Sequence, residues 1–310
     1  MRITNNVLNN SFIRNLSKNL KQMQKYQNQL STGKEVSRPS DNPLLVGKIM
    51  SMDNNIMQNE QYNSNISDTL GWVKTQDSAL RDATDVLHRI KDLMIYASNG
   101  SLSETDRGAI KDEVQMQVEH LADVLNTNFD GRYIFGGQET TTRPFEVGDA
   151  SGSMLNYNDK PGAKENITRE IATGVTIDLI VDGSKITNTD NASADNQDLG
   201  VLLGKVITAI DRGDEDDLKN LSEDYLADIE FHTDNVVKVR TQIGAINNRL
   251  DAAKDRNESE NLNLKSVLSE KEDIDIAEKF MEYMVMTTVY QASLSIGSKI
   301  LQPSILDYLR

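Results

Sequence analysis

The sequence contains no cysteine, little proline and no long apolar run. None of its 310 residues is cysteine, which excludes a disulfide framework and a thiolate metal site. Only five prolines are present, and their scarcity favours long helices over many compact units. The opening MRITNNVLNN lacks the apolar core of a cleavable signal peptide, and no run of about 18 apolar residues occurs. We therefore expect no membrane-spanning helix and, if the chain is exported, a route that reads another signal.

Large rings and histidines are also scarce. Aromatic residues make up 5 % of the chain, with one Trp, whereas a thick globular core usually draws on more rings. A thin seam of Leu, Ile, Val and Met between helices does not need them. The three histidines, His88, His120 and His232, are scattered, and His232 falls on a predicted core position. Because no cluster marks a pocket, we predict no catalytic residue, no cofactor, no metal site and no enzyme.

The net charge of −15 is unevenly distributed. Residues 1–40 carry seven Lys or Arg against one acid, whereas residues 270–310 carry four bases and seven acids. Opposite charges on the two ends favour their pairing modestly, because salt screens exposed ion pairs. So acidic a chain is a poor nucleic-acid binder, since neutralising phosphates needs clustered cations. The basic start lacks bulky aromatic anchors beyond Phe12 and Tyr26, so no membrane partner is expected either.

Both ends of the chain carry a heptad stripe. Spacings of four and three residues predict amphipathic helices of about six turns, which are marginal in water when isolated. Each seam therefore needs a partner, and the nearest candidate is the other end of the same chain. The N-terminal stripe comprises Leu16, Leu20, Met23, Gln27 and Leu30, and the C-terminal stripe comprises Ile276, Phe280, Tyr283, Thr287, Tyr290, Leu294, Gly297 and Leu301.

Further helices are predicted between the two ends. An apolar stripe from Leu45 predicts a helix over 43–97, and a capping-box pattern at Ser103 and Asp106 starts another over 103–128. Helices resume over 199–210 and from Asp214, and two heptad positions persist from Ile229 to Val267. Four polar residues fall on these stripes, and they either set the register through polar contacts or mark where the stripe turns to solvent: Asn59, Asn63, Asp77 and Asn257.

The period changes after Gly131. Alternating segments with glycine turns predict strands at 133–135, 145–147, 154–157, 167–171 and 175–181. The predicted fold is mainly α with a β-rich insertion, in which the N- and C-terminal halves form a long helical, coiled-coil bundle. We expect three regions: a terminal coiled-coil assembly domain of 1–42 with 270–310, a helical rod domain of 43–130 with 198–269, and a β-rich inserted domain of 131–197.

Short motifs near both termini resemble the flagellin superfamily, and within it the hook-associated proteins that join hook to filament. Individually they are weak, but their order and their anchoring at both ends are specific. The resemblance covers about 1–137 and 225–310. Its main motifs are Leu30-Ser31-Thr32-Gly33-Lys34, Pro39-Ser40-Asp41-Asn42-Pro43, Tyr96-Ala97-Ser98-Asn99-Gly100, Asp130-Gly131-Arg132-Tyr133-Ile134-Phe135-Gly136-Gly137 and Ser304-Ile305-Leu306-Asp307-Tyr308-Leu309.

The resemblance implies a structural subunit of the bacterial flagellum at the hook–filament junction. It implies an extracellular location after export through the flagellar type III apparatus, and an export chaperone on the C-terminal segment. The implied partners are copies of the same chain in a ring, the neighbouring hook-associated junction protein and flagellin. The alternative within the superfamily is flagellin itself, the bulk filament subunit. A scaffolding coiled coil of the cytoplasm is the alternative outside it.

We expect assembly through the terminal helices, with their seams buried only against the other end of the chain and neighbouring subunits. The residues predicted to form this assembly interface are Leu16, Leu20, Met23, Leu30, Phe280, Tyr283, Tyr290, Leu294, Leu301, Leu306 and Tyr308.

Overall fold

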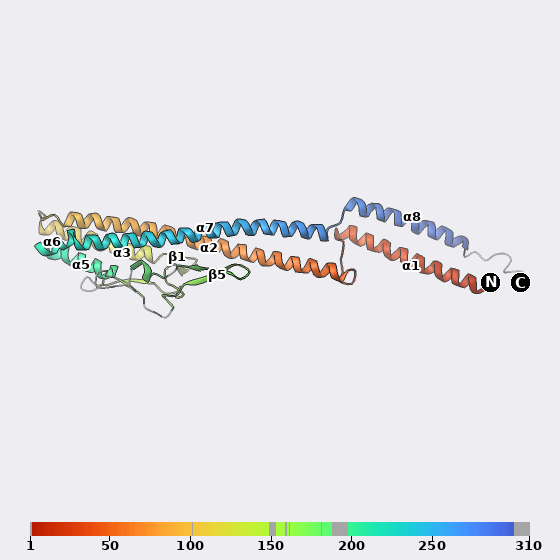
Figure 1. Cartoon of the computed structure of the whole chain (residues 1–310), viewed down its shortest axis with the longest axis horizontal. Coiled ribbons are helices and arrows are strands. Elements are labelled where there is room, and N and C mark those ends of the chain that lie inside the picture. Colours follow the sequence, from red (N-terminus) through yellow and green to blue (C-terminus); the bar gives the residue numbers. More distant parts are fainter. Residues whose placement is uncertain are drawn as a thin grey trace. The chain divides into compact units, whose positions relative to one another are not determined.

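The computed structural model describes residues 2–100, 102–148, 153–158, 160, 162–180, 182–187 and 198–300. Helices dominate it, as the sequence predicts (Figure 1). The expected fold class, mainly α with a strand-containing insertion, is confirmed. The helices are α1 Arg2–Thr32, α2 Pro43–Ala97, α3 Glu104–Leu125, α4 Ser184–Thr187, α5 Leu199–Arg212, α6 Glu215–Ser222, α7 Asp224–Glu272 and α8 Ile276–Ile300.

The strands pair as three antiparallel hairpins within the described residues. β1 Asn128–Phe129 pairs with β2 Arg132–Tyr133, β3 Phe145–Val147 with β4 Leu155–Tyr157, and β5 Ile167–Ala172 with β6 Val175–Leu179. The turn between β1 and β2 is Asp130-Gly131, with φ of 52° and 76°. Two successive positive φ values suit the right-handed twist of a two-residue hairpin, which explains the Asp-Gly pair.

The chain packs as two compact units. One comprises Met1–Glu60 and Ser259–Arg310, and the other Gln61–Glu258. Both breaks fall inside long helices, α2 and α7, rather than at a loop. The three-part division expected from the sequence, with boundaries near 42, 130, 197 and 270, stays a prediction.

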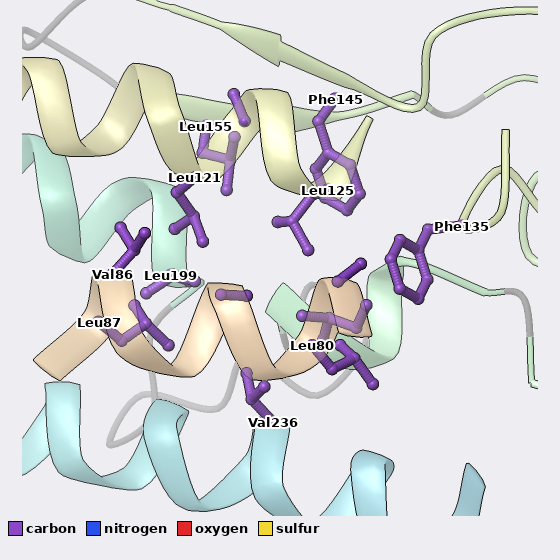
Figure 2. Packing of buried hydrophobic residues seen from close by; sticks show 14 of the residues in the cluster. Leu80, Val86, Leu87, Leu121, Leu125, Phe135, Phe145, Leu155, Leu199 and Val236 are labelled. Carbon is purple, nitrogen blue, oxygen red and sulfur yellow. The ribbon is translucent and has the colours of Figure 1, made fainter. Parts of the chain in front are cut away.

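A continuous apolar core fills the unit 61–258. Figure 2 shows α2 between α3 on one side and α7 on the other, with Leu80 and Leu87 pointing among side chains of both neighbours. The buried positions of α7 follow the predicted heptad from Ile229 to Ala253, and His232 is one of them. α5 is buried along most of its length because apolar residues occupy both the predicted stripe and the positions beside it. The core is therefore a helical seam thickened by α5, with the strands added at its edge.

Buried amides attach the hairpins to this helical core. Gln76 of α2 donates from Nε2 to the carbonyl oxygens of Ile134 at 3.1 Å and Ile180 at 2.8 Å. Asn126 exchanges two hydrogen bonds with the backbone of Phe145, at 2.9 and 3.0 Å. Because a buried polar group left unpaired costs stability, these amides fix where the strands sit on the bundle.

The predicted helix ends form as expected. Ser103 and Asp106 make a reciprocal capping box at the start of α3, and the Asn42 side chain accepts from the Leu45 N–H at 3.2 Å. Gly213 ends α5 in the left-handed conformation, with φ of 64°. Sequence chemistry alone was sufficient at these positions, since each cap is a local interaction.

The polar residues on the predicted seams divide between the two interpretations. Asn59 and Asn257 are buried, so at these two positions the stripe does not turn to solvent. Asp77 lies at the edge of its seam and accepts from Arg240 at 2.8 Å.

Candidate assembly surface

The two ends of the chain pair, as predicted, through α1 and α8. Gly297 of α8 is buried against the ring of Phe12, with no room for a Cβ. Further along, the Thr287 hydroxyl lies 3.9 Å from the Met23 sulfur, and the Lys279 ammonium lies 5.8 Å from the centre of the Tyr26 ring. These contacts mark one face of α8 as the face that meets α1.

A short clip joins the two linkers next to this pair. The Glu35 N–H donates to the Glu272 carbonyl at 2.7 Å, and the Ile274 N–H donates to the Gly33 carbonyl at 3.1 Å. Lys34 pairs in antiparallel fashion with Asp273, and its ammonium donates to the Glu272 carboxylate. Residues more than 230 positions apart in the sequence are thus hydrogen-bonded as in a miniature sheet.

Charge reinforces the clip. The hydrogen bond to Glu272 raises the pKa of Lys34 above its ordinary value. Lys279 lies 3.5 Å from Glu35 and 3.2 Å from Glu282. Burial disfavours its charge, but the two carboxylates outweigh burial and raise the pKa of Lys279. The basic start and the acidic tail of the chain therefore attract each other at defined pairs.

The other faces of α8 expose a large apolar surface. Phe280 is 53 % exposed and Leu294 is 45 % exposed. Contiguous apolar surface of this kind on one element is typical of a surface that a partner covers. We call it the α8 apolar face, and it comprises Ile276, Phe280, Met281, Met284, Val285, Val289, Leu294 and Ile296.

The predicted interface residues therefore fall in two groups. Leu16, Met23, Leu30, Tyr283 and Tyr290 are half-buried, whereas Leu20, Phe280 and Leu294 are exposed. Leu301, Leu306 and Tyr308 lie outside the described residues. The single stripe expected on α8 thus splits between the α1-facing side and the α8 apolar face. Whether either group contacts other subunits stays a prediction.

Sequence reasoning missed Gln29. Its side chain is 2 % exposed, and its Nε2 donates to the Glu35 carbonyl at 2.7 Å, which fixes the linker after α1. A glutamine next to a seam leucine is not a signal by itself, because its bonding partner is a backbone oxygen that no pattern identifies. Lys279 and Tyr26 were likewise invisible as a pair, since they come from opposite ends of the chain.

Two searches of the described residues bear on the class of protein. No described helix is both long enough and apolar enough to cross a membrane. Across the same residues, no group of three or more His, Cys, Asp or Glu side chains is arranged to hold a metal ion.

Comparisons with known proteins place the two ends together. Residues 3–140 match the model of the bacterial flagellin N-terminal helical region, and residues 226–309 match the bacterial flagellin C-terminal helical region. The chain is 26 % identical to flagellar hook-associated protein 3 of Escherichia coli K12 over 302 residues, covering 94 % of this chain and 95 % of that one. It is 24 % identical to flagellin of Bacillus subtilis over 302 residues, covering 94 % of each.

Among solved structures, the chain resembles the flagellar junction protein FlgL of Legionella pneumophila. The TM-score is 0.57 at 16 % identity, and the match covers 73 % of this chain and all of that one. At this identity the likeness concerns the fold alone.

Proposed function

The chain belongs to the bacterial flagellin family, and we propose that within this family it is the structural subunit that forms the junction between hook and filament. Similarity to hook-associated protein 3 along nearly the whole length of both chains supports this function over that of a bulk flagellin. Support also comes from the TM-score with the Legionella junction protein, whose fold covers the whole of that chain.

The observation that carries the proposal is the α8 apolar face. A free monomer gains nothing from exposing Phe280 and Leu294 beside a helix pair that is already formed. Burying this face against neighbouring subunits would drive assembly, at about 25 cal/mol per Å² of apolar surface, against the entropy of ordering the ends. The subunit itself then acts without chemistry, as a permanent adaptor between two different polymers.

We extend the proposal to partners and location. Copies of the chain would form a ring that contacts a neighbouring hook-associated junction protein on one side and flagellin on the other. The subunit would leave the cell through the flagellar export apparatus, with a chaperone on its C-terminal segment beforehand, and reside outside the cell. The chain lacks a recognisable cleavable signal sequence at its start, which is compatible with that route.

The variant Leu294→Asp tests the function of the α8 apolar face. Because Leu294 is exposed and does not face α1, a carboxylate there should leave the fold of the unit 61–258 intact while blocking burial against another subunit. In cells lacking the natural gene, we expect hooks without filaments when this variant is supplied. Filaments counted by electron microscopy give the result, and thermal unfolding of the purified variant confirms its fold.

Val237→Asp is the matched control. Val237 lies on α7 and is 44 % exposed, close to Leu294, but it is outside the terminal pair. This variant should restore filament attachment. Filaments of normal number with Leu294→Asp, or their equal loss with Val237→Asp, would show that the α8 apolar face does not carry assembly.

A further inference from the structure

A pocket of about 590 Å³ lies in the unit 61–258, between α2 and the hairpins β1–β2 and β5–β6. Its floor is apolar: Trp72 and Leu179 are buried there, and Phe129 and Ile167 are half-buried beside them. Trp72 and Phe129 meet edge to face, with ring centres 6.0 Å apart. The volume falls in the range of pockets that take a ligand or several side chains. We call it the Trp72 pocket.

A buried donor on the pocket floor has no acceptor. Trp72 is 6 % exposed, yet its indole Nε1 makes no hydrogen bond within the described chain. Buried indole N–H groups usually find a partner, because an unpaired donor forfeits the hydrogen bonds it had in water. This floor therefore suits an occupant that brings a hydrogen-bond acceptor.

The rim of the Trp72 pocket is charged and unpaired. Arg132, Arg169, Asp68 and Asp130 all line it and are all exposed. Within the described residues no ion pair involves any of the four, although long surface side chains of opposite sign readily pair. Two guanidinium groups and the indole N–H make the pocket rich in donors. An apolar occupant carrying partial negative charge would match both floor and rim.

The same unit exposes a segment with these properties at the end of α2. Ile95 and Tyr96 are 50 % and 57 % exposed, and they lie in the last turn of the helix. That turn contains no basic residue, so the negative end of the helix dipole is uncompensated. The segment thus offers two adjacent apolar side chains next to backbone acceptors, and its phenol can donate to a rim carboxylate.

We infer that the Trp72 pocket receives the Ile95–Tyr96 turn of a second copy of this chain. Pocket and knob are different surfaces, so the contact is heterologous and repeats from copy to copy, as a ring or helix requires. The inference rests on the proposed function, since it assumes that copies assemble, and it adds a contact outside the terminal helices. Burial of Tyr96 against Trp72 and Phe129 supplies the apolar part of the contact, and Arg132 and Arg169 supply the electrostatic part.

Complementation between two full-length variants tests the contact. Tyr96→Asp removes the knob, and the double variant Arg132→Glu with Arg169→Glu reverses the donors at the pocket rim. Each variant alone should associate at least about tenfold more weakly than the natural chain in sedimentation at rising concentration, because each lacks one half of the contact. Mixed together they should restore one-to-one complexes, since the first retains its pocket and the second its knob.

Trp72 reports on the same event directly. It is the only tryptophan in the sequence, so its emission should change on association of the natural chain and stay constant for either variant alone. Met116→Asp is the matched control, because Met116 is an exposed apolar residue on α3 outside the contact, and it should behave as the natural chain does.

Three outcomes would overturn the inference: variants that associate like the natural chain, a mixture that stays dissociated, or association lost with the pocket variant but not with Tyr96→Asp, which would mean a different occupant. A natural chain that is absent from flagella would instead contradict the proposed function, whatever these variants do.

Discussion

At the scale of single residues, the start of α3 depends on hydrogen bonds exchanged between Ser103 and Asp106. The Asp106 N–H donates to the Ser103 hydroxyl at 3.2 Å, while the Asp106 carboxylate accepts from the Ser103 hydroxyl at 2.6 Å and from its N–H at 3.3 Å. These bonds lower the pKa of Asp106, chiefly through the side-chain bond and secondly through the backbone bond. The charged form of Asp106 therefore stabilises the folded chain.

The linkage fixes the direction of a pH effect. Because the folded pKa of Asp106 lies below its unfolded value, near 4, its contribution is present above that value and is lost as the pH falls through the folded pKa. Asp106→Asn should lower the denaturant midpoint at neutral pH, and the difference from the natural chain should shrink on acidification. Urea unfolding at pH 7 and below pH 4 measures it, with Asp112→Asn, also on α3, as the control. A difference that is constant with pH would contradict the cap assignment.

Residue-scale chemistry was predictable where it is local. The capping box and the glycine that ends α5 follow from residues three or four positions apart, so the sequence alone identified them. Gln29 and the clip of Lys34 with Glu272 and Asp273 could not be found in this way. Their partners are either backbone atoms or side chains from the opposite end of the chain, which no spacing rule connects.

At the scale of elements, α8 differs from the other long helices in having apolar residues around most of its circumference. Met281, Met284 and Val285 lie outside the predicted stripe and are exposed. Periodicity then cannot select one face, because several frames fit equally well. This is why the predicted stripe mixed Tyr283 and Tyr290, which are half-buried, with Phe280 and Leu294, which are exposed.

The strands were predicted more closely than that face. Four of the five expected segments overlap β3 to β6 at nearly the same bounds, because glycine turns and alternation mark both ends. Where 133–135 was expected as one strand, β2 ends at Tyr133, and Ile134 and Phe135 are instead buried as part of the core. The pairing of the strands, and their attachment through Gln76 and Asn126, needed the structure.

Packing of α1 on α8 gives a prediction for Gly297. A Cβ at this position would collide with the Phe12 ring, so Gly297→Ala should push the two helices apart, at a cost of about 1–3 kcal/mol for overpacking. Hydrogen exchange of α1 and α8 amides should accelerate. Gly244→Ala is the control, because its Cβ meets nothing within 4 Å and alanine favours helix by up to about 1 kcal/mol. Slower exchange in Gly297→Ala, like that expected in α7 of the control, would contradict the pairing.

At the scale of the whole molecule, the sequence predicted the class of protein more firmly than its contacts. Motifs at both termini identified the family before any fold was considered, and the family models match the same two regions. Scarcity of rings and proline indicated helical seams, and the described chain is built on them. The Trp72 pocket was not predictable, because its walls come from α2 and two hairpins whose mutual packing no local pattern encodes.

The central claim is that this chain is a junction subunit and not a bulk filament protein. Immunogold labelling of isolated flagella with an antibody against the strand-containing insertion tests it most directly, with an antibody against the flagellin of the same cells as the control. The account predicts gold confined to the point where hook meets filament, in few copies per flagellum. Gold distributed along the length of the filament would contradict it and identify the chain as a flagellin.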